Sequence, residues 1–282
     1  MADPANRNNP GARPVAFDVD RGRLTYHPAG PATEPGLPAV PSSSRSDLAA
    51  LVAAAGTTTT RWAVTSLDGG VGRSTVAVAL AGLLASGAGH VLLVDGNPSP
   101  WPAVATTVGV APCPAVQALQ DPRPWPEWIP KSASGVFLLT GSAPGYPSLS
   151  GWDLQRLANL TGAVEFRHII TDWPAGTMPA VAIGYTLLVA RADAGSLERV
   201  VQLLNAGVLD PSRTTLVLND ATTVADIDRR ARTLTTALEG RVDQLVHLRR
   251  DKALSARPYQ PTKLAAATAT ALTQILTKGT HR

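Results

Sequence analysis

The sequence predicts an α/β fold: a doubly wound, mostly parallel sheet of about seven strands, preceded by a disordered N-terminal arm. Short apolar runs alternate with amphipathic stretches, a glycine-rich loop follows the first apolar run, and the N-terminus is rich in Pro, Gly and Ser without a helical or strand period. With 282 residues, of which 44% are hydrophobic, the chain is long enough to build one such domain around its own core.

The N-terminal arm is predicted to span residues 1–45, which hold many of the prolines. Within it, residues 15–19 and 23–26 are candidates for short extended pieces that pair with an edge offered by a partner or by the main domain. Order is expected from Ser46, where Ser46 and Asp47 can cap a short helix, so the predicted domain spans residues 46–282.

Seven apolar runs are short, continuous and rich in β-branched residues, which is typical of buried parallel strands. They cover residues 62–65, 91–94, 136–139, 168–171, 185–190, 215–218 and 244–248. Helices are expected between them, at 74–86, 151–162, 196–207, 224–239 and 262–277. In such a fold ligands bind beyond the carboxyl ends of the strands.

Composition limits the choice of compartment and partner. The net charge of +4 comes from scattered arginines, so it permits contact with nucleic acid without requiring it. The single cysteine, Cys113, excludes an intramolecular disulfide and a zinc site of the usual kind. No signal peptide and no apolar run long enough to span a bilayer is found, so we expect a cytoplasmic protein without a membrane span.

Residues 62–81 read as a strand, a glycine-rich turn and the start of a helix in direct succession. Gly69, Gly70 and Gly72 leave room for a phosphate to approach the main chain, whose N–H groups and the following helix N-terminus favour an anion. Ser74 is placed to offer its hydroxyl to Mg²⁺. The alternative is a tight strand-to-helix turn that binds no ligand.

The loop reads Asp68-Gly69-Gly70-Val71-Gly72-Arg73-Ser74-Thr75. It resembles the Lys-Gly-Gly-Val-Gly-Lys-Thr-Thr loop of the ParA/MinD family of deviant P-loop ATPases, of which the chain would be a degenerate member. The resemblance implies a P-loop NTPase-like domain in which all eight of these residues contact ATP or ADP, bound with Mg²⁺.

Both lysines of the family loop are replaced. Arg73 stands where the family's lysine clasps the β- and γ-phosphates, and a planar guanidinium differs in shape from an ammonium. Asp68 stands where a lysine reaches across a homodimer to the partner's phosphates. A carboxylate about 4 Å from a phosphate charge is repelled by roughly 4 kcal/mol at an effective dielectric of 20, which argues against the usual ATP-sandwiched dimer.

Two acidic segments extend the resemblance. Asp95-Gly-Asn97-Pro is similar to the family's Asp-x-Asp-Pro first switch, in which the second aspartate orients and deprotonates water; Asn97 can bind a water but cannot take its proton. Asp172 and Gly176 match the second switch, in which the aspartate holds magnesium through water and the glycine senses the γ-phosphate. The alternatives are a plain Asn-Pro turn and, for the adjacent Trp173, packing against the sheet.

The resemblance therefore implies catalytic roles for Asp95, Asn97 and Asp172, and a Mg²⁺ site at Ser74, Asp95 and Asp172. Asn219, at the end of a strand, is similar to the family's adenine-binding asparagine; its alternative is to cap a turn.

Candidate partner surfaces are less specific. The arginines of the C-terminal third match the nonspecific DNA-binding surface of some family members, but acidic residues interleave with them, as on a solvated face. A Trp/Pro-rich insertion that carries Trp101, Trp125 and Trp128 is either a protein-docking surface or a packed loop.

Two functions follow from these observations. The first is a nucleotide-binding switch or adaptor with weak or lost ATP hydrolysis, which positions or partitions a cargo such as DNA or a conjugation or secretion complex. The second is a pseudo-ATPase scaffold that binds no nucleotide and uses the arm or the insertion to bind a protein partner.

Overall fold

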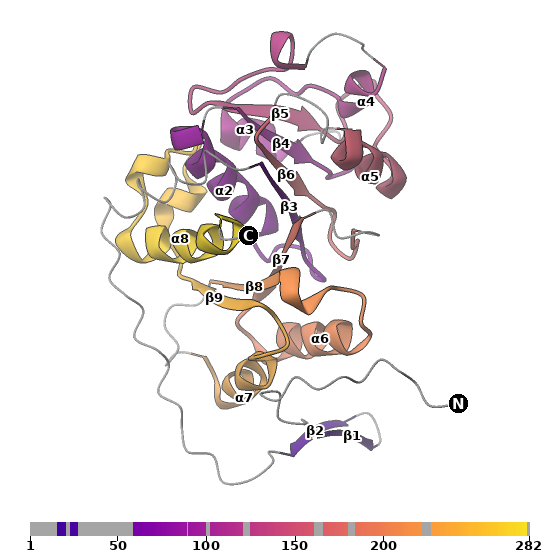
Figure 1. The fold of residues 1–282 in the computed structure, drawn as a ribbon, viewed down its shortest axis with the longest axis vertical. Coiled ribbons are helices and arrows are strands. Elements are labelled where there is room, and N and C mark those ends of the chain that lie inside the picture. Colours follow the sequence, from indigo (N-terminus) through magenta and orange to yellow (C-terminus); the bar gives the residue numbers. More distant parts are fainter. Residues whose placement is uncertain are drawn as a thin grey trace.

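The computed structural model describes residues 16–20, 23–27 and 59–280, except 89, 100–101, 121–124, 161–165, 180–183 and 221–226. Its main element is a seven-stranded sheet in which every pair of neighbours is parallel, in the order β5-β4-β6-β3-β7-β8-β9 (Figure 1). The strands are β3 (Thr60–Thr65), β4 (Val91–Asp95), β5 (Val136–Thr140), β6 (His168–Asp172), β7 (Tyr185–Arg191), β8 (Thr214–Asn219) and β9 (Gln244–Leu248). The predicted doubly wound sheet and all seven of its strands are confirmed.

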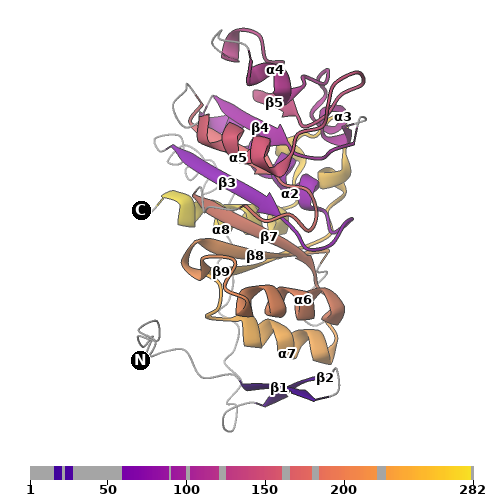
Figure 2. The same ribbon diagram turned by 90° about the vertical axis from the view of Figure 1, so that its right-hand side faces the viewer.

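Helices cover both faces of this sheet, as Figures 1 and 2 show. On one face lie α2 (Arg73–Ala88), α3 (Ala103–Val108) and α8 (Ala266–Thr280), and on the other lie α4 (Ala115–Ala118), α5 (Gly151–Leu160), α6 (Ala194–Asn205) and α7 (Arg229–Leu238). Short 3-10 turns complete the chain at Trp125–Glu127, Pro211–Arg213, Lys252–Ser255 and Pro261–Lys263. The five helices predicted between the strands and after the last strand all have counterparts, although α7 begins later than expected, where the Asp228 side chain caps it by accepting a hydrogen bond from Ala231 N.

The core is divided between the two faces because strand side chains alternate. Along β4, Val91 and Leu93 pack toward α2, whereas Leu92 and Val94 pack toward α5. Residues 76–84 of α2 are all buried, because β-strands lie on one side of the helix, and α3 and the turns Lys252–Ser255 and Pro261–Lys263 lie against it elsewhere.

The N-terminal region contributes one described feature. Strands β1 (Ala16–Asp20) and β2 (Arg23–His27) pair antiparallel with each other, so the predicted extended pieces form a hairpin of their own. The rest of the predicted disordered arm, and the predicted short helix after Ser46, lie outside the described residues. The domain boundary at residue 46 stays a prediction.

The insertion between β4 and β5 is a packed loop in its described part. Two short helices, α3 and α4, form there although the sequence analysis expected none. Trp125 is buried beside Phe137, and Trp128 packs against the same cluster. Trp101 lies outside the described residues. Since both described tryptophans are held by the core, they do not form an exposed docking surface.

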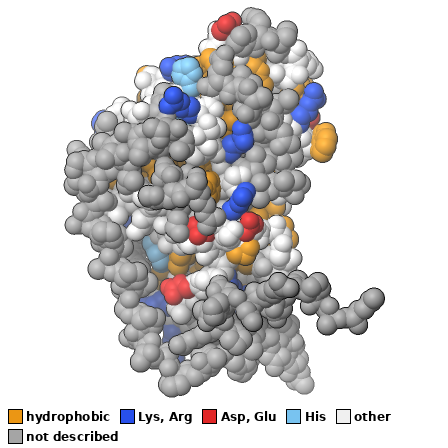
Figure 3. All heavy atoms as spheres, in the orientation of Figure 1, with side chains coloured by type: hydrophobic (Ala, Val, Ile, Leu, Met, Phe, Trp, Pro, Cys, Tyr) orange, Lys and Arg blue, Asp and Glu red, His pale blue; other side chains and the backbone are white. Residues whose placement is uncertain are grey.

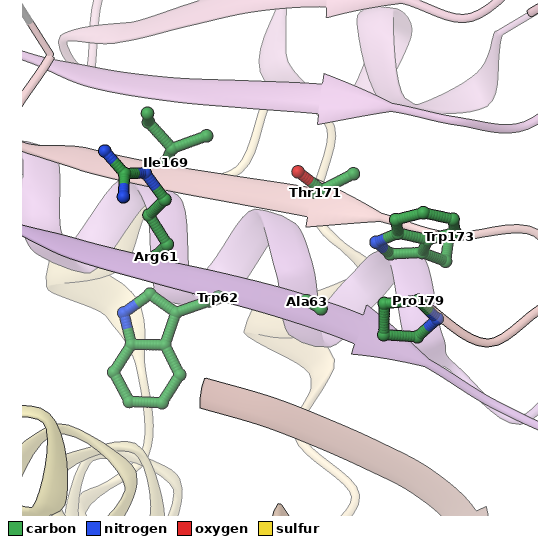
Figure 4. Close-up of a pocket in the computed structure, with 7 residues that line it drawn as sticks. All are labelled: Arg61, Trp62, Ala63, Ile169, Thr171, Trp173 and Pro179. Carbon is green, nitrogen blue, oxygen red and sulfur yellow. The ribbon is translucent and has the colours of Figure 1, made fainter. Parts of the chain in front are cut away.

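Trp173 also packs against the sheet, as the alternative interpretation expected. Its side chain is buried, and its main-chain N–H donates to Val64 O at 2.8 Å. Figure 4 shows it with Pro179 at one end of a hollow between β3 and β6, in which Arg61 lies at the other end. The hollow has a cavity volume of only about 10 Å³ and is partly open to solvent, and no phosphate-loop residue lines it.

A residue of β6, an inner strand of the sheet, provides a test of the assigned core. Ile170 is fully buried between the sheet and α2, so we expect Ile170→Ala to lower the free energy of unfolding by about 2–5 kcal/mol. Val208→Ala, at a side chain that is 53% exposed, should change it by less than about 0.5 kcal/mol. Urea unfolding followed by circular dichroism measures both, and equal losses would contradict the assigned core.

Candidate functional site

The candidate site lies at the carboxyl edge of the sheet, where the order of strands reverses. β3 comes first along the sheet-forming chain yet lies in its middle, with β6 and β4 on one side and β7 and β8 on the other. The loop that follows β3 therefore sits at the topological switch point, where open α/β sheets bind their ligands.

This loop turns sharply before α2. Gly70 and Gly72 have φ values of 70° and 85°, a left-handed conformation that favours glycine, and Gly69 is exposed. Val71 is buried and anchors the loop to the core. These features match the strand, turn and helix order expected of a phosphate loop.

The first turn of α2 begins at Arg73, followed by Ser74 and Thr75, all three half-buried. Arg73 does not point to open space: its Nε donates to Asp172 Oδ1 at 2.5 Å. A guanidinium at the helix start thus reaches the carboxyl end of β6. The Ser74 hydroxyl lies beside the same carboxylate.

Asp95 and Asp172 are brought together as the sequence predicted. They are direct partners in the register of β4 and β6, and both are fully buried. Asp95 Oδ1 accepts from the N–H of Asn97 at 3.0 Å. Among the described residues, Asp95 Oδ2 and Asp172 Oδ2 have no hydrogen-bond partner, and neither has the hydroxyl of Thr140, which is the register partner of Asp95 on β5.

Burial dominates the electrostatics of this pair. Burial, and then the charge of Asp172, raises the pKa of Asp95 to about 7, against a smaller opposing effect of Asn97 N–H and Arg73. Burial also raises the pKa of Asp172, and Arg73 and Ser74 offset part of that rise. Arg73 therefore offsets only part of the cost of burying these two carboxyl groups.

The donor set at this place fits a small hard cation. Two carboxylate oxygens without partners and a serine hydroxyl are oxygen ligands of the kind that Mg²⁺ takes, usually with waters and substrate phosphates completing its octahedron. The described residues contain no group of three or more His, Cys, Asp or Glu side chains that would form an all-protein metal cage. A cation shared between protein and phosphates is the arrangement these residues suit.

Asp68 is turned back toward its own chain. Its Oδ2 accepts from Arg199 Nη2 at 2.8 Å and from Ser196 Oγ at 2.9 Å, both on α6. The hydrogen bond from Arg199 is the largest of the effects that hold the pKa of Asp68 below its usual range. Its negative charge, which the sequence analysis expected to face a triphosphate, is compensated within the chain.

The other side of the loop is held by side chains from β7 and β8. Arg191 Nη2 donates to Gly70 O at 3.3 Å, and Asn219 Nδ2 donates to Val71 O at 2.7 Å. A Cβ added at Gly72 would overlap the Asn219 amide. Asn219 is therefore packed directly against the loop.

The two switch segments differ in how they are held. The Asn97 side chain accepts from Ser99 N at 3.1 Å, so it takes part in the turn that the alternative interpretation expected. Gly176, with φ 74°, donates its N–H to Ser66 O at 2.8 Å and so lies beside the start of the phosphate loop. The roles predicted for Asn97 in catalysis and for Gly176 in γ-phosphate sensing stay predictions.

On the face drawn in Figure 3, the described Lys and Arg side chains lie apart from one another, with acidic side chains near some of them. On α7, Arg229, Arg230 and Arg232 are exposed, and Arg230 forms an ion pair with Glu198 of α6. Nonspecific DNA binding stays a prediction. Over the part of the chain that the structure describes, no helix is both long and apolar enough to cross a bilayer.

The sequence did not point to three residues that contact the loop, Arg191, Ser196 and Arg199, or to Thr140, the register partner of Asp95. The position of Arg191 and Thr140 at strand ends was a usable signal, because strand ends form the ligand edge. No local signal marks Ser196 or Arg199, whose contact with Asp68 joins residues 128 and 131 positions apart.

Comparison with known proteins identifies the fold. No family model matches the chain, and no curated protein matches it. MinD of Pyrococcus horikoshii complexed with Mg-ADP aligns with a TM-score of 0.55 at 18% identity over 77% of this chain and 94% of that one. MinD of Pyrococcus furiosus aligns with a TM-score of 0.55 at 22% identity over 78% and 97%. A ParA-family ATPase of Chlorobium tepidum aligns with a TM-score of 0.53 at 16% identity over 79% and 94%. The chain has the ParA/MinD-like fold.

The raised pKa of Asp95 predicts a pH-dependent stability. A carboxyl group whose folded pKa of about 7 exceeds its unfolded value of 3.8 stabilises the fold at low pH and loses that contribution as pH rises through 7. Asp95→Asn keeps an acceptor for Asn97 N–H and removes the charge, so it should raise stability at pH 8 by roughly 1–3 kcal/mol and flatten the profile between pH 5 and 8.

Thermal unfolding in ligand-free buffer from pH 5 to pH 8 measures this effect. Asp153→Asn is the matched control, because the pKa of Asp153 is lowered by its hydrogen bonds to Ser150 and it does not titrate in that range. A profile of Asp95→Asn as steep as that of the wild type would contradict the assignment.

Proposed function

We propose that this protein binds ATP or ADP with Mg²⁺ at the carboxyl edge of its sheet and acts as a nucleotide-held switch or adaptor with weak or lost hydrolysis. The observation that carries the proposal is the buried pair Asp95 and Asp172, each with one unpartnered oxygen, of which Asp172 is bound through its other oxygen to Arg73 at the start of α2. Two adjacent buried carboxylates are costly unless a cation is bound with them.

Each part of the site has a task in this proposal. Main-chain N–H groups of residues 68–72 and the N-terminus of α2 would hold the phosphates. Ser74, Asp95 and Asp172 would hold Mg²⁺, whose chemistry is to neutralise phosphate charge. MinD of Pyrococcus horikoshii, which shares the fold, was solved with Mg-ADP, and this supports the same class of ligand here.

Weak hydrolysis is inferred from the side chains around the proposed phosphates. Arg73 is bound to Asp172 through its Nε, and this ion pair restricts how the guanidinium can turn toward a phosphate. Asn97 can orient a water through hydrogen bonds but has no basic group to accept a proton from it. Asp68 brings a negative charge where the ParA/MinD loop has a lysine, although Arg199 compensates it.

The second candidate, a scaffold that binds no nucleotide, has one observation in its favour. The loop and one carboxylate are already satisfied within the chain, through Arg73, Arg191, Asn219 and Arg199. A loop whose polar groups are already hydrogen-bonded within the chain does not need a ligand for stability. The orphaned oxygens of Asp95 and Asp172 argue against this candidate.

The cargo and partners belong to the same proposal. ParA/MinD-like neighbours are ATPases of positioning systems, which supports a role in positioning or partition of DNA or of a conjugation or secretion complex in the cytoplasm. A protein partner through the N-terminal arm is proposed. Because Asp68 is bound to Arg199 within the chain, we expect any homodimer to lack the lysine-mediated crossing between subunits.

Titration calorimetry with ATP and ADP in magnesium, with phosphate release followed on the same sample, tests the proposal. We expect binding of both nucleotides with little phosphate release. Asp172→Asn should weaken the magnesium-dependent part of binding at least tenfold, whereas Asp153→Asn, whose carboxylate is hydrogen-bonded to Ser150, should leave it unchanged. Absence of binding at millimolar nucleotide would leave the scaffold.

Restoring the family side chains tests the inferred cause of weak hydrolysis. Arg73→Lys with Asn97→Asp should raise the rate of phosphate release at least tenfold, since it returns a phosphate-binding ammonium and a base. Adding Asp68→Lys to this double variant should reverse part of the gain in rate, because the new lysine would lie beside Arg199 and Arg191. Adding Arg199→Glu as well should recover it, and the same rate in all variants would contradict this account.

A further inference from the structure

We infer that Asn219 and Arg191 position the phosphate loop by holding two of its main-chain carbonyls, and that Asn219 acts on the loop and not as the reader of the base. This inference rests on the proposed function, because it assigns how the proposed phosphate site is kept in shape. It departs from the role that the ParA/MinD resemblance implied for Asn219.

The two side chains form one unit. Arg191 and Asn219 are register partners at the carboxyl ends of β7 and β8. They donate to successive loop carbonyls, Arg191 Nη2 to Gly70 O at 3.3 Å and Asn219 Nδ2 to Val71 O at 2.7 Å. We call this arrangement the carbonyl clamp. Its parts come from neighbouring strands of the rigid sheet, so their spacing is fixed by the strand pairing.

The contact at Gly72 ties Asn219 still more closely to the loop. An added Cβ at Gly72 would overlap the Asn219 amide, and the backbone there has a φ of 85°. Glycine at this position is thus required twice, by the turn and by the asparagine. The NH₂ group of the Asn219 amide therefore contacts the loop directly.

The clamp determines where the loop N–H groups point. In a trans peptide the C=O and the N–H of the following residue point in opposite directions. With the carbonyls of Gly70 and Val71 held toward β7 and β8, the N–H groups of Val71 and Gly72 are directed away from those strands. In the sheet order this is the side of β6 and β4, where Asp172 and Asp95 lie. Donors directed to that side can meet a phosphate whose cation is bound by the carboxylates.

Arg191 also places a positive charge beside the phosphate loop. It is exposed, and its guanidinium, like Arg199, lowers the pKa of Asp68. Arg199 is bound to the Asp68 carboxylate, whereas the acceptor that the structure gives Arg191 is a neutral carbonyl. Arg191 therefore fixes the loop and leaves positive charge at its rim, which favours a ligand with more phosphates.

A measurement without ligand tests the clamp by itself. Hydrogen exchange of the peptide that covers residues 66–76 should be about fivefold faster in Asn219→Ala than in wild type, the factor that one hydrogen bond is typically worth. Arg191→Ala should show a smaller increase in the same peptide. Asn205→Ala and Arg213→Ala, at exposed positions on α6 and before β8, are the matched controls and should leave it unchanged. Exchange in β4 reports whether a variant still folds.

Titration with ATP, GTP and tripolyphosphate then separates the two roles of Asn219. A loop-positioning asparagine predicts that Asn219→Ala weakens all three ligands by a similar factor of about five, because tripolyphosphate has no base to recognise. Loss confined to ATP, with unchanged tripolyphosphate binding and unchanged exchange of the loop, would overturn the inference. If the wild type binds none of the three, the proposed function fails, and the exchange measurement still decides whether the clamp exists.

Discussion

Two carboxylates buried side by side at the ends of β4 and β6 are the constraint around which this molecule is arranged. Each would be expensive to ionise out of water, and their mutual repulsion adds to the cost. Arg73 compensates Asp172 from the first residue of α2, which fixes where that helix begins. The remaining oxygens of the pair have no partner among the described residues, so the fold retains an unfavourable local charge arrangement. Such an arrangement is understandable where a ligand supplies the missing cation.

The loop beside this pair is held by side chains from α6, β7 and β8. Asp68 connects it to α6 through Ser196 and Arg199, while Arg191 and Asn219 hold its carbonyls from the strand ends. The ParA/MinD loop instead carries lysines at the positions of Asp68 and Arg73. In this chain Asp68 places a negative charge where the family loop has a lysine, and the positive charge that balances it, Arg199, lies on α6. The fold is therefore shared, whereas the electrostatics of the site are this chain's own.

Much of the fold was predictable because its signals are local. Continuous apolar runs such as residues 91–94 and 136–139 can be buried only on both faces of a parallel sheet, and the structure places β4 and β5 there. The glycine loop, Asp95 and Asp172 were predictable for the same reason, since each follows an apolar run directly. The helices α3 and α4 were missed because they are short and begin after prolines in a segment with turn composition.

The contacts of the site were less predictable than its members. Nothing near Asp68 in the sequence indicates that Arg199 will neutralise it, because the pairing depends on the tertiary position of α6. Likewise, Asn219 ends a strand in the manner expected of either a base-binding or a turn-forming residue, and only the packing against Gly72 shows its contact with the loop. Sequence pattern identifies which residues reach the ligand edge, and packing decides what they touch there.

The burial of α2 has a mechanical consequence. This helix carries Arg73, Ser74 and Thr75 at its start, and its central residues are surrounded by the sheet, α3 and the turns before α8. Sliding or tilting it would open voids on several sides at once, and a close-packed interior resists this strongly. We therefore expect a structural response to a change at the phosphate loop to involve the segments that contact it at the sheet edge, among them those after β4 and β6, and not a shift of α2. We thus expect α2 to keep its position while the segments at the carboxyl edge of the sheet adjust.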